Sequence, residues 1–349
     1  MILRKGEGLY RSKRGLDRDR SARGTRAERA HELLLLLLKH LLHTMRLLLG
    51  VALVCTATAM PKHIVHIIAD DLGWAGVSWH RNASNAAVAS DIRTPRLHAL
   101  LSESLDLDRF YTYNICSPSR CAIQTGRNPV HVNVVNVPPE SVNPQDAIGG
   151  WQGIPVNMST VANKLQGAGW ATHLVGKWDI GMATEQHHPR ARGYDSWFGY
   201  WHHSNDYYQQ TVETCKLKKI KDLWRYNSSV DGPARGDANA ADCTATHQNT
   251  SGDGRCVFEE QLLSAEAQRI VRAHNRSRSL YLMYSMHLVH MPLQIPAAVE
   301  AEFAFIDDEY RRKNHAMVSF LDGEVGALVD TLKETGLWND TLLVFHADK

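Results

Sequence analysis

Four short apolar runs recur along the chain, and segments with helical periodicity separate them. The runs are HIVHIIA (63–69), ATHLVG (171–176), LYLMYSM (280–286) and LLVFHA (342–347). Segments 258–274 and 315–335 carry apolar residues at helical spacing, and Gly336 follows the second one, as expected at a helix end. Strands that alternate with helices predict an α/β fold with crossover connections. A chain of 349 residues is long enough to bury a large core of this kind.

Polar residues follow the four runs at the points where the strands would end. They are Asp70, Asp71, Lys177, His290 and Asp348. Since α/β sheets assemble their sites at the carboxyl ends of strands, we predict a functional site at this edge. Adjacent carboxylates after a buried strand repel each other unless a cation binds them, and their oxygens favour Ca²⁺ or Mg²⁺. A simple turn stabilised by aspartate side chains is the alternative for the first pair.

The stretch CSPSRCAIQTGR (116–127) adds a cysteine and two arginines to this set. The Ser-Pro pair after Cys116 predicts a turn, and the residues that follow favour a helix, so the cysteine would lie beside a helix N-terminus that attracts negative charge. Arg120 and Arg127 are suited to a tetrahedral oxyanion such as sulfate or phosphate. A metal, cations and a proton-donating histidine around one nucleophile indicate hydrolysis of an anionic ester.

The same stretch resembles the signature of the type I sulfatases, in which Cys-x-Pro-Ser-Arg directs oxidation of the cysteine to formylglycine. Further stretches resemble motifs of that family in order: IIADDLGW (67–74), VGKWDIG (175–181), ARGYDSWFGY (191–200), LVHMPLQIP (288–296) and GLWNDTLLVFHAD (336–348). The resemblance covers about residues 61–348, and the stretch 193–208 is most similar to the arylsulfatase B-like branch. It implies an alkaline phosphatase/sulfatase-like α/β fold, with a mixed central sheet, helices on both faces and a smaller C-terminal domain.

The resemblance also implies roles for individual residues. The implied ligands of a calcium ion are Asp70, Asp71, Asp348 and the modified Cys116. The hydrated formylglycine would use one hydroxyl to attack sulfur and expel the alcohol, and the second to release sulfate and restore the aldehyde. Arg120 and Lys177 would bind the sulfate group, and His290 would bind it and protonate the leaving oxygen. Arg127 is interpreted as a structural residue.

Two positions depart from the family pattern. The family usually has a histidine two residues after the lysine, which takes the proton of the second hydroxyl, and this chain has Asp179. A carboxylate can also act as a base, and an ion pair with a neighbour is the alternative. The family has an asparagine ligand where this chain has Lys349, whose charge opposes a metal ion. We therefore expect a weakened metal site and a catalytic domain, residues 60–349, that lacks its closing strands and smaller domain.

The first 59 residues differ in composition from the rest. Residues 1–44 carry 11 Lys/Arg and 5 Asp/Glu, and are expected to form a low-complexity extension that does not fold with the domain. Residues 45–59 resemble a secretory signal peptide, with Met45 as the favoured start. A membrane anchor is the alternative, although Lys39, His40 and His43 interrupt the apolar run below the ~20 residues of a span. The remaining 27 basic and 32 acidic residues give no sign of nucleic-acid binding.

Glycosylation sites and cysteines favour a secreted or lysosomal protein. Asn-x-Ser/Thr triplets begin at Asn82, Asn157, Asn227, Asn249, Asn275 and Asn339. With Cys55 in the signal segment and Cys116 reserved for chemistry, Cys121, Cys215, Cys243 and Cys256 allow three pairings. A local disulfide within the polar insertion 205–257 is the favoured arrangement.

Three hypotheses follow. The first is a sulfatase that cleaves sulfate esters of aryl groups or sugars, matured by the formylglycine-generating enzyme. The second is a phosphodiesterase or phosphatase of the same superfamily, which the cysteine motif disfavours because those enzymes use Thr or Ser as the nucleophile. The third is a non-catalytic glycan-binding protein built on an incomplete sulfatase fold, which Asp179 and the expected truncation favour and the intact Cys116 motif disfavours.

Overall fold

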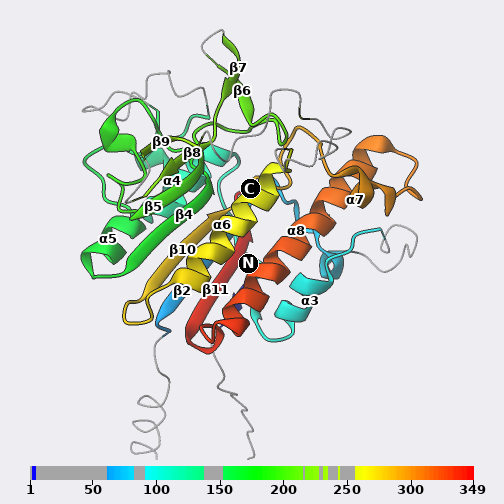
Figure 1. The fold of residues 1–349 in the computed structure, drawn as a ribbon, viewed down its shortest axis with the longest axis horizontal. Helices are drawn as coiled ribbons and strands as arrows, with labels where there is room; N and C mark the ends of the chain where they lie inside the picture. Colours follow the sequence, from blue (N-terminus) through cyan, green and yellow to red (C-terminus); the bar gives the residue numbers. More distant parts are fainter. Residues whose placement is uncertain are drawn as a thin grey trace, which may run out of the picture. The chain divides into compact units, whose positions relative to one another are not determined.

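The computed structural model describes residues 2–4, 61–81, 91–136, 152–214, 217–227, 231–234, 243 and 256–349. The signal segment, Cys55, Asn82, Cys215 and Asn249 lie outside these ranges. Within them, one large mixed sheet has the strand order β3-β1-β11-β2-β10-β4-β5-β8-β9. Its strands run through the centre of Figure 1, with helices packed on them. The α/β prediction is therefore confirmed.

Five neighbouring strands in the middle of the sheet are parallel. They are β11 (Thr341–Ala347), β2 (His63–Ala69), β10 (Leu280–Ser285), β4 (Ala171–Lys177) and β5 (Ser196–Tyr200). The first four are the four apolar runs of the sequence, within one residue at each end. Because they are parallel and adjacent, the polar residues that follow them lie at one edge of the sheet.

The two faces of these strands are buried in two separate cores. Along β2, Val65 and Ile67 pack into one core, whereas Ile68 packs into the other. On β10, Leu282 and Met283 divide in the same way. Strands buried on both faces require near-continuous apolar runs rather than alternation, which explains why the sequence showed such runs.

Helices cover both faces of the sheet, as expected. The first core includes residues of α3 (Pro95–Leu101), α6 (Glu259–Ala273) and α8 (Glu309–Glu334). The second includes residues of α4 (Cys116–Thr125) and α5 (Val161–Gly167), which lie across the sheet from α6 and α8 in Figure 1. The remaining short helices are α7 (Ala297–Ala301) and the 3₁₀ turns Trp74–Gly76, Ser78–His80, Pro129–His131, Glu185–His187 and Trp338–Asp340.

Two helices begin earlier than the sequence predicted. Helix α8 starts at Glu309 rather than 315, because the Asp308 side chain accepts a hydrogen bond from the Arg311 backbone N–H at 2.8 Å and caps the helix. Helix α4 starts at Cys116, so Pro118 belongs to its first turn and the predicted turn before the helix is wrong. A proline is tolerated there because its missing N–H has no helical partner in the first turn.

Short strands that the sequence analysis did not predict extend the sheet at both edges. At one edge these are β1 (Ile2–Arg4) and β3 (Leu105–Asp106), and at the other β8 (Trp224–Tyr226) and β9 (Asp231–Pro233). Strand β1 pairs antiparallel with β11, so residues 2–4 fold with the domain, contrary to the expectation for the N-terminal extension. Its backbone supplies hydrogen-bonding partners to the otherwise open edge of β11.

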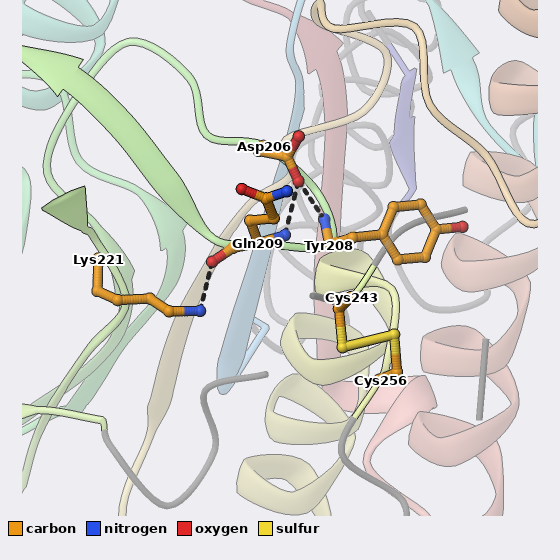
Figure 2. Close-up of a disulfide and its surroundings, with 6 residues drawn as sticks. All are labelled: Asp206, Tyr208, Gln209, Lys221, Cys243 and Cys256. Atoms are coloured by element: carbon orange, nitrogen blue, oxygen red, sulfur yellow. Dashed lines mark hydrogen bonds between the residues drawn. A yellow bond between two sulfur atoms is a disulfide. The ribbon is translucent and has the colours of Figure 1, made fainter. Parts of the chain in front are cut away.

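The polar insertion 205–257 contains a local disulfide, as favoured from the sequence. Cys243 is bonded to Cys256, and Cys121 is a buried free thiol. Figure 2 shows the disulfide beside a turn in which the Asp206 carboxylate accepts the backbone N–H groups of Tyr208 and Gln209, at 2.9 and 2.6 Å. A separate two-stranded sheet, β6 (Thr211–Thr214) with β7 (Leu217–Lys221), follows this turn. Among the described residues, none of the helices has the length and apolar character needed to cross a bilayer.

We predict that Gly176→Ala destabilises the fold. Gly176 has φ +96°, and a Cβ atom there would lie 1.8 Å from the backbone oxygen of Ser285 on the neighbouring strand β10. Neither backbone can move without breaking the ladder, so the free energy of unfolding should fall by about 3 kcal/mol, measured by urea denaturation. Gly323→Ala, on an exposed and open turn of α8, is the control and should raise it by about 0.5–1 kcal/mol. Equal effects would contradict the close approach of the two strands.

Candidate active site

Cys116 is the first residue of α4 and is almost completely buried, with 2% of its surface exposed. Its Sγ lies 3.8 Å from Oδ1 of Asp70, the residue that follows β2. Burial raises the pKa of the Cys116 thiol to about 12, with the carboxylates of Asp70 and Asp348 adding to the effect of burial. An unmodified Cys116 is therefore protonated at neutral pH and is a poor thiol nucleophile.

Arg120 lies one helical turn after Cys116, on the same face of α4. Its guanidinium joins two buried carboxylates, with Nη2 at 3.3 Å from Asp70 and at 2.9 Å from Asp348. It also donates to Oγ of Ser285, at the end of β10. The cysteine and arginine of the sequence motif thus meet the carboxyl ends of three parallel strands.

Lys177 is the last residue of β4, and its ammonium is fully buried. Nζ lies 2.8 Å from Oδ2 of Asp70 and 3.6 Å from Oδ2 of Asp179. Burial alone would lower the pKa of Lys177, but these two carboxylates outweigh it and raise the pKa. Lys177 is therefore a permanent cation that can pair with an anionic group.

Asp179 joins this cluster from the other side of Lys177. Its Oδ1 accepts a hydrogen bond from Ser117 Oγ at 2.9 Å and lies 2.7 Å from Nδ1 of His203. Burial tends to raise the pKa of Asp179, but Lys177 and His203 lower it to about 2. The carboxylate is thus ionised at neutral pH. The residue has φ +56°, a backbone conformation that costs energy outside glycine.

His290 reaches the site on a loop that follows β10. Its Nε2 lies 3.7 Å from Oδ2 of Asp71, and its Nδ1 lies 2.7 Å from the backbone oxygen of Met291. Backbone bonds hold the loop against β2: Asp70 N–H donates to the oxygen of Leu288, and Val289 N–H donates to the oxygen of Asp70. The predicted contact between the His290 loop and the first strand end is therefore direct.

Two buried side chains that were assigned no role from the sequence support the same loop. Glu260 on α6 accepts the backbone N–H groups of His287 at 3.0 Å and Leu288 at 3.2 Å. The Tyr207 hydroxyl lies 2.9 and 3.0 Å from the backbone oxygens of His287 and His290. The only feature of the sequence that pointed to Glu260 was its place in a helical segment rich in apolar residues, where a carboxylate is expected to be buried.

Side chains of Asp70, Asp71, Cys116 and His290 converge, with one ligand atom of each within 4.8 Å of the others. Two hard carboxylate oxygens in this group suit a divalent cation such as Ca²⁺. Asp348 lies beside the group rather than in it, since its carboxylate accepts from Arg120 and from the backbone N–H of Asp71 at 3.2 Å. The donor set thus fits a metal ion, with His290 nearer to it than the sequence suggested.

Lys349 places an ammonium group among these same side chains. Its Nζ lies 2.7 Å from Oδ1 of Asp71 and 3.8 Å from Sγ of Cys116. The pKa of Lys349 is raised, because the bond to Asp71 and the nearby carboxylates outweigh partial burial. An ammonium group held among the metal-ligand candidates has to move before a divalent ion can bind them.

A cavity of about 770 Å³ opens beside Lys349. Its lining includes the aromatic side chains of Trp74, Phe110, Tyr111 and Tyr113, all of them partly exposed. Arg127, by contrast, lies on the exposed surface beyond the end of α4 and takes no part in the cluster. Its structural role stays a prediction.

The comparison with protein families adds a decisive observation, because the family model described as Sulfatase matches residues 62–349. The chain belongs to the sulfatase family. Mouse arylsulfatase J is 27% identical over 84% of this chain and 43% of its own length. Pig N-acetylgalactosamine-6-sulfatase is 26% identical over 88% of this chain and 53% of its own length. The chain therefore spans about half the length of these sulfatases.

Solved structures agree with the family assignment. The crystal structure of Ps i-CgsB has 26% identity and a TM-score of 0.62, and the match covers 83% of this chain and 58% of that one. The PsFucS1 sulfatase from Pseudoalteromonas sp. is 22% identical, with a TM-score of 0.64 over 85% of this chain and 56% of that one, and shows the shared fold. The sulfatase-like fold class expected from the sequence is confirmed.

We predict that Glu260 makes stability depend on pH. Burial raises the pKa of Glu260 to about 7 in the folded state, from 4.5, although bonds from Tyr284 and from the His287 backbone oppose this. The folded state then binds a proton more tightly than the unfolded one, so the free energy of unfolding should fall as pH rises from about 4.5 to 7. Glu260→Gln should flatten this fall in chemical denaturation series.

The exposed Glu302, changed to Gln, serves as the control and should leave the pH dependence of the wild type intact. If Glu260→Gln and Glu302→Gln give the same slope of unfolding free energy against pH, Glu260 is not the titrating group.

Proposed function

We propose that this chain carries the catalytic centre of a sulfuric ester hydrolase, which cleaves sulfate monoesters through a formylglycine made from Cys116 and a bound Ca²⁺. The observation that carries the proposal is the position of Cys116. It is buried within a complete Cys-Ser-Pro-Ser-Arg motif, and two permanent cations, Arg120 and Lys177, share with it the carboxylate of Asp70.

Arg120 and Lys177 would bind the sulfate group. Both are buried and already paired with carboxylates, so they are oriented before the substrate arrives. Donors fixed in this way stabilise developing negative charge without reorganising during the reaction. The planar guanidinium suits two sulfate oxygens at once, and the ammonium acts as a point charge on a third.

Formylglycine, once hydrated, would supply a hydroxyl for attack on sulfur and a second hydroxyl whose deprotonation releases sulfate. His290 would protonate the leaving alcohol oxygen, because its partly exposed position beside Asp71 allows exchange of protons with solvent. Asp179, ionised and next to Ser117, would accept the proton in the second half of the reaction. The ligands of the calcium ion would be Asp70, Asp71 and the modified residue 116, together with Asp348 once its carboxylate turns from Arg120 toward the ion.

A sulfated sugar is the proposed substrate class. N-acetylgalactosamine-6-sulfatase is named for a sugar, and Ps i-CgsB was solved in complex with k-i-k-neocarrahexaose. The aromatic side chains of the cavity beside Lys349 are suited to packing against a ring. Aryl sulfates would fit the same surface, which makes them suitable assay substrates.

Maturation in the secretory pathway is part of the proposal. Formylglycine requires the formylglycine-generating enzyme, and the disulfide between Cys243 and Cys256 is of the kind formed in oxidising compartments. Asn157, Asn275 and Asn339 begin glycosylation triplets and are exposed. We propose a secreted or lysosomal location, with membrane attachment only if the N-terminal segment stays uncleaved.

A non-catalytic protein on the sulfatase fold is the second candidate. The ion pair between Lys349 and Asp71 favours it, because this pair occupies the position of a metal ligand. A phosphatase or phosphodiesterase is disfavoured by the cysteine at the nucleophile position, since burial keeps its thiol protonated.

One experiment tests the proposal against both alternatives. The chain is expressed in cells that contain the formylglycine-generating enzyme, the tryptic peptide with residue 116 is mapped by mass spectrometry, and turnover of a chromogenic aryl sulfate is measured. Aldehyde with turnover, both lost in Cys116→Ala, supports the sulfatase. Unmodified cysteine contradicts the mechanism, and aldehyde without turnover favours the non-catalytic fold.

We predict that Lys349→Asn raises the affinity for Ca²⁺ by about 10-fold or more, measured by calorimetry. The change removes a cation 2.7 Å from Asp71 and adds a neutral oxygen donor. Lys62→Asn, which removes a similar ion pair with Asp340 on the surface, is the control and should leave the affinity unchanged. Equal affinities for all three proteins would show that the metal site lies elsewhere.

A further inference from the structure

His203 lies within the stretch 193–208 and was assigned no role from the sequence, yet it contacts the cluster around Cys116. It follows strand β5, and its Nδ1 lies 2.7 Å from Oδ1 of Asp179. Its side chain is about one quarter exposed. An imidazole this close to an ionised carboxylate carries its proton on the facing nitrogen, because two lone pairs at this distance would repel each other.

The two oxygens of the Asp179 carboxylate have different surroundings. Oδ1 is shared by His203 and by Ser117, the residue next to Cys116. Oδ2 is buried and makes no hydrogen bond within the part of the chain that the structure describes, and the Lys177 ammonium lies 3.6 Å from it. Lys177 in turn contacts Asp70, which faces Cys116. Oδ2 therefore faces the Lys177 ammonium and keeps a lone pair available to accept a proton.

The position of Oδ2 depends on what holds Oδ1. Lys177 attracts either oxygen, so a carboxylate without other restraints would turn to place both near the ammonium. The hydrogen bond from Ser117 and the close contact with His203 oppose that rotation, and the backbone at φ +56° does not itself determine the side-chain torsion. The His203 contact is the shorter of the two, at 2.7 Å against 2.9 Å.

We propose that His203 is a positioning residue for Asp179: its Nδ1 holds Oδ1 and keeps Oδ2 beside Lys177, where it can accept a proton from residue 116. This inference rests on the proposed function, in which Asp179 is the base of the sulfate-releasing half of the reaction. The family pattern has a histidine at position 179 itself, so this chain divides the task between a carboxylate at that position and an imidazole from the segment after β5.

The proton balance of that half of the reaction is complete. The hydroxyl of the hydrated residue 116 would give its proton to the carboxylate of Asp179, and its oxygen would form the carbonyl double bond. The C–O bond to the sulfate breaks, and sulfate leaves with the electron pair. Asp179 then passes the proton to solvent, and addition of water to the carbonyl restores the starting hydrate. His203 keeps its own proton on Nδ1 throughout.

A structural readout tests the hydrogen bond without any turnover. In the full chain labelled with ¹⁵N-histidine, the Nδ1 of His203 should carry a proton, and Asp179→Asn should shift this resonance. His202 provides a matched control, because its Nδ1 lies 2.6 Å from Asp222 instead, and its resonance should stay in place. The spectra of His203→Gln and His202→Gln identify the two signals. A His203 resonance that carries no proton on Nδ1, or that ignores Asp179→Asn, overturns the proposal.

Kinetics then separate positioning from folding. With an aryl sulfate, His203→Ala should leave release of the first equivalent of alcohol unchanged and slow steady-state sulfate release about 10- to 100-fold. His203→Gln, whose amide N–H can replace the donor, should recover most of that loss. The double variant Asp179→Asn/His203→Ala should be no slower than Asp179→Asn alone, because the two residues act as a unit.

Equal loss of alcohol release and sulfate release in His203→Ala, with no rescue by glutamine, overturns the positioning role. Failure of the proposed function would give a different experimental result. If wild-type protein carries no aldehyde at residue 116, or carries it without turnover, the reaction and the catalytic part of this inference fall together. The nitrogen resonances would still decide whether His203 holds Asp179.

Discussion

The buried carboxylate of Asp70, placed between two buried cations, is the interaction on which the rest of the site depends. Lys177 approaches one oxygen from the end of β4, and Arg120 approaches the other from α4. The Asp70 backbone also bonds the loop that carries His290. Removing one member of such a cluster leaves an uncompensated buried charge, which costs far more than the cluster contributes to stability. The charges therefore hold two strands, a helix and a loop in one arrangement.

The charges of the cluster largely offset one another. Four carboxylates, those of Asp70, Asp71, Asp179 and Asp348, face three cations. The cations are Arg120, Lys177 and Lys349. An incoming sulfate group can pair with the cations only if the carboxylates bind something else instead. A divalent metal ion is the partner that carboxylate oxygens favour. The balance explains why the identity of residue 349 matters, since a lysine there supplies the positive charge that a metal ion would bring.

Much of the fold follows from local patterns. Four strands are buried on both faces: β2, β4, β10 and β11. Each therefore needs a continuous apolar run, and such a run can be recognised in the sequence. Strand β5 was missed because its SWFGY segment mixes aromatics with glycine, and β8 and β9 were missed because three residues carry no periodicity. The pairing of β1 with β11 joins the two ends of the chain, and no local pattern reports so distant a contact.

The sequence by itself determined which chemical groups the site contains. Cys116, Arg120, Lys177 and the aspartates stand in motifs whose spacing depends only on a helical turn or a strand end, and such geometry is local. Only the tertiary structure decided which groups share a partner. His203 on Asp179, Glu260 under the His290 loop and Lys349 on Asp71 are contacts between distant segments. They exist because parallel strands bring their carboxyl ends to one edge, where buried charges must find partners wherever the chain supplies them.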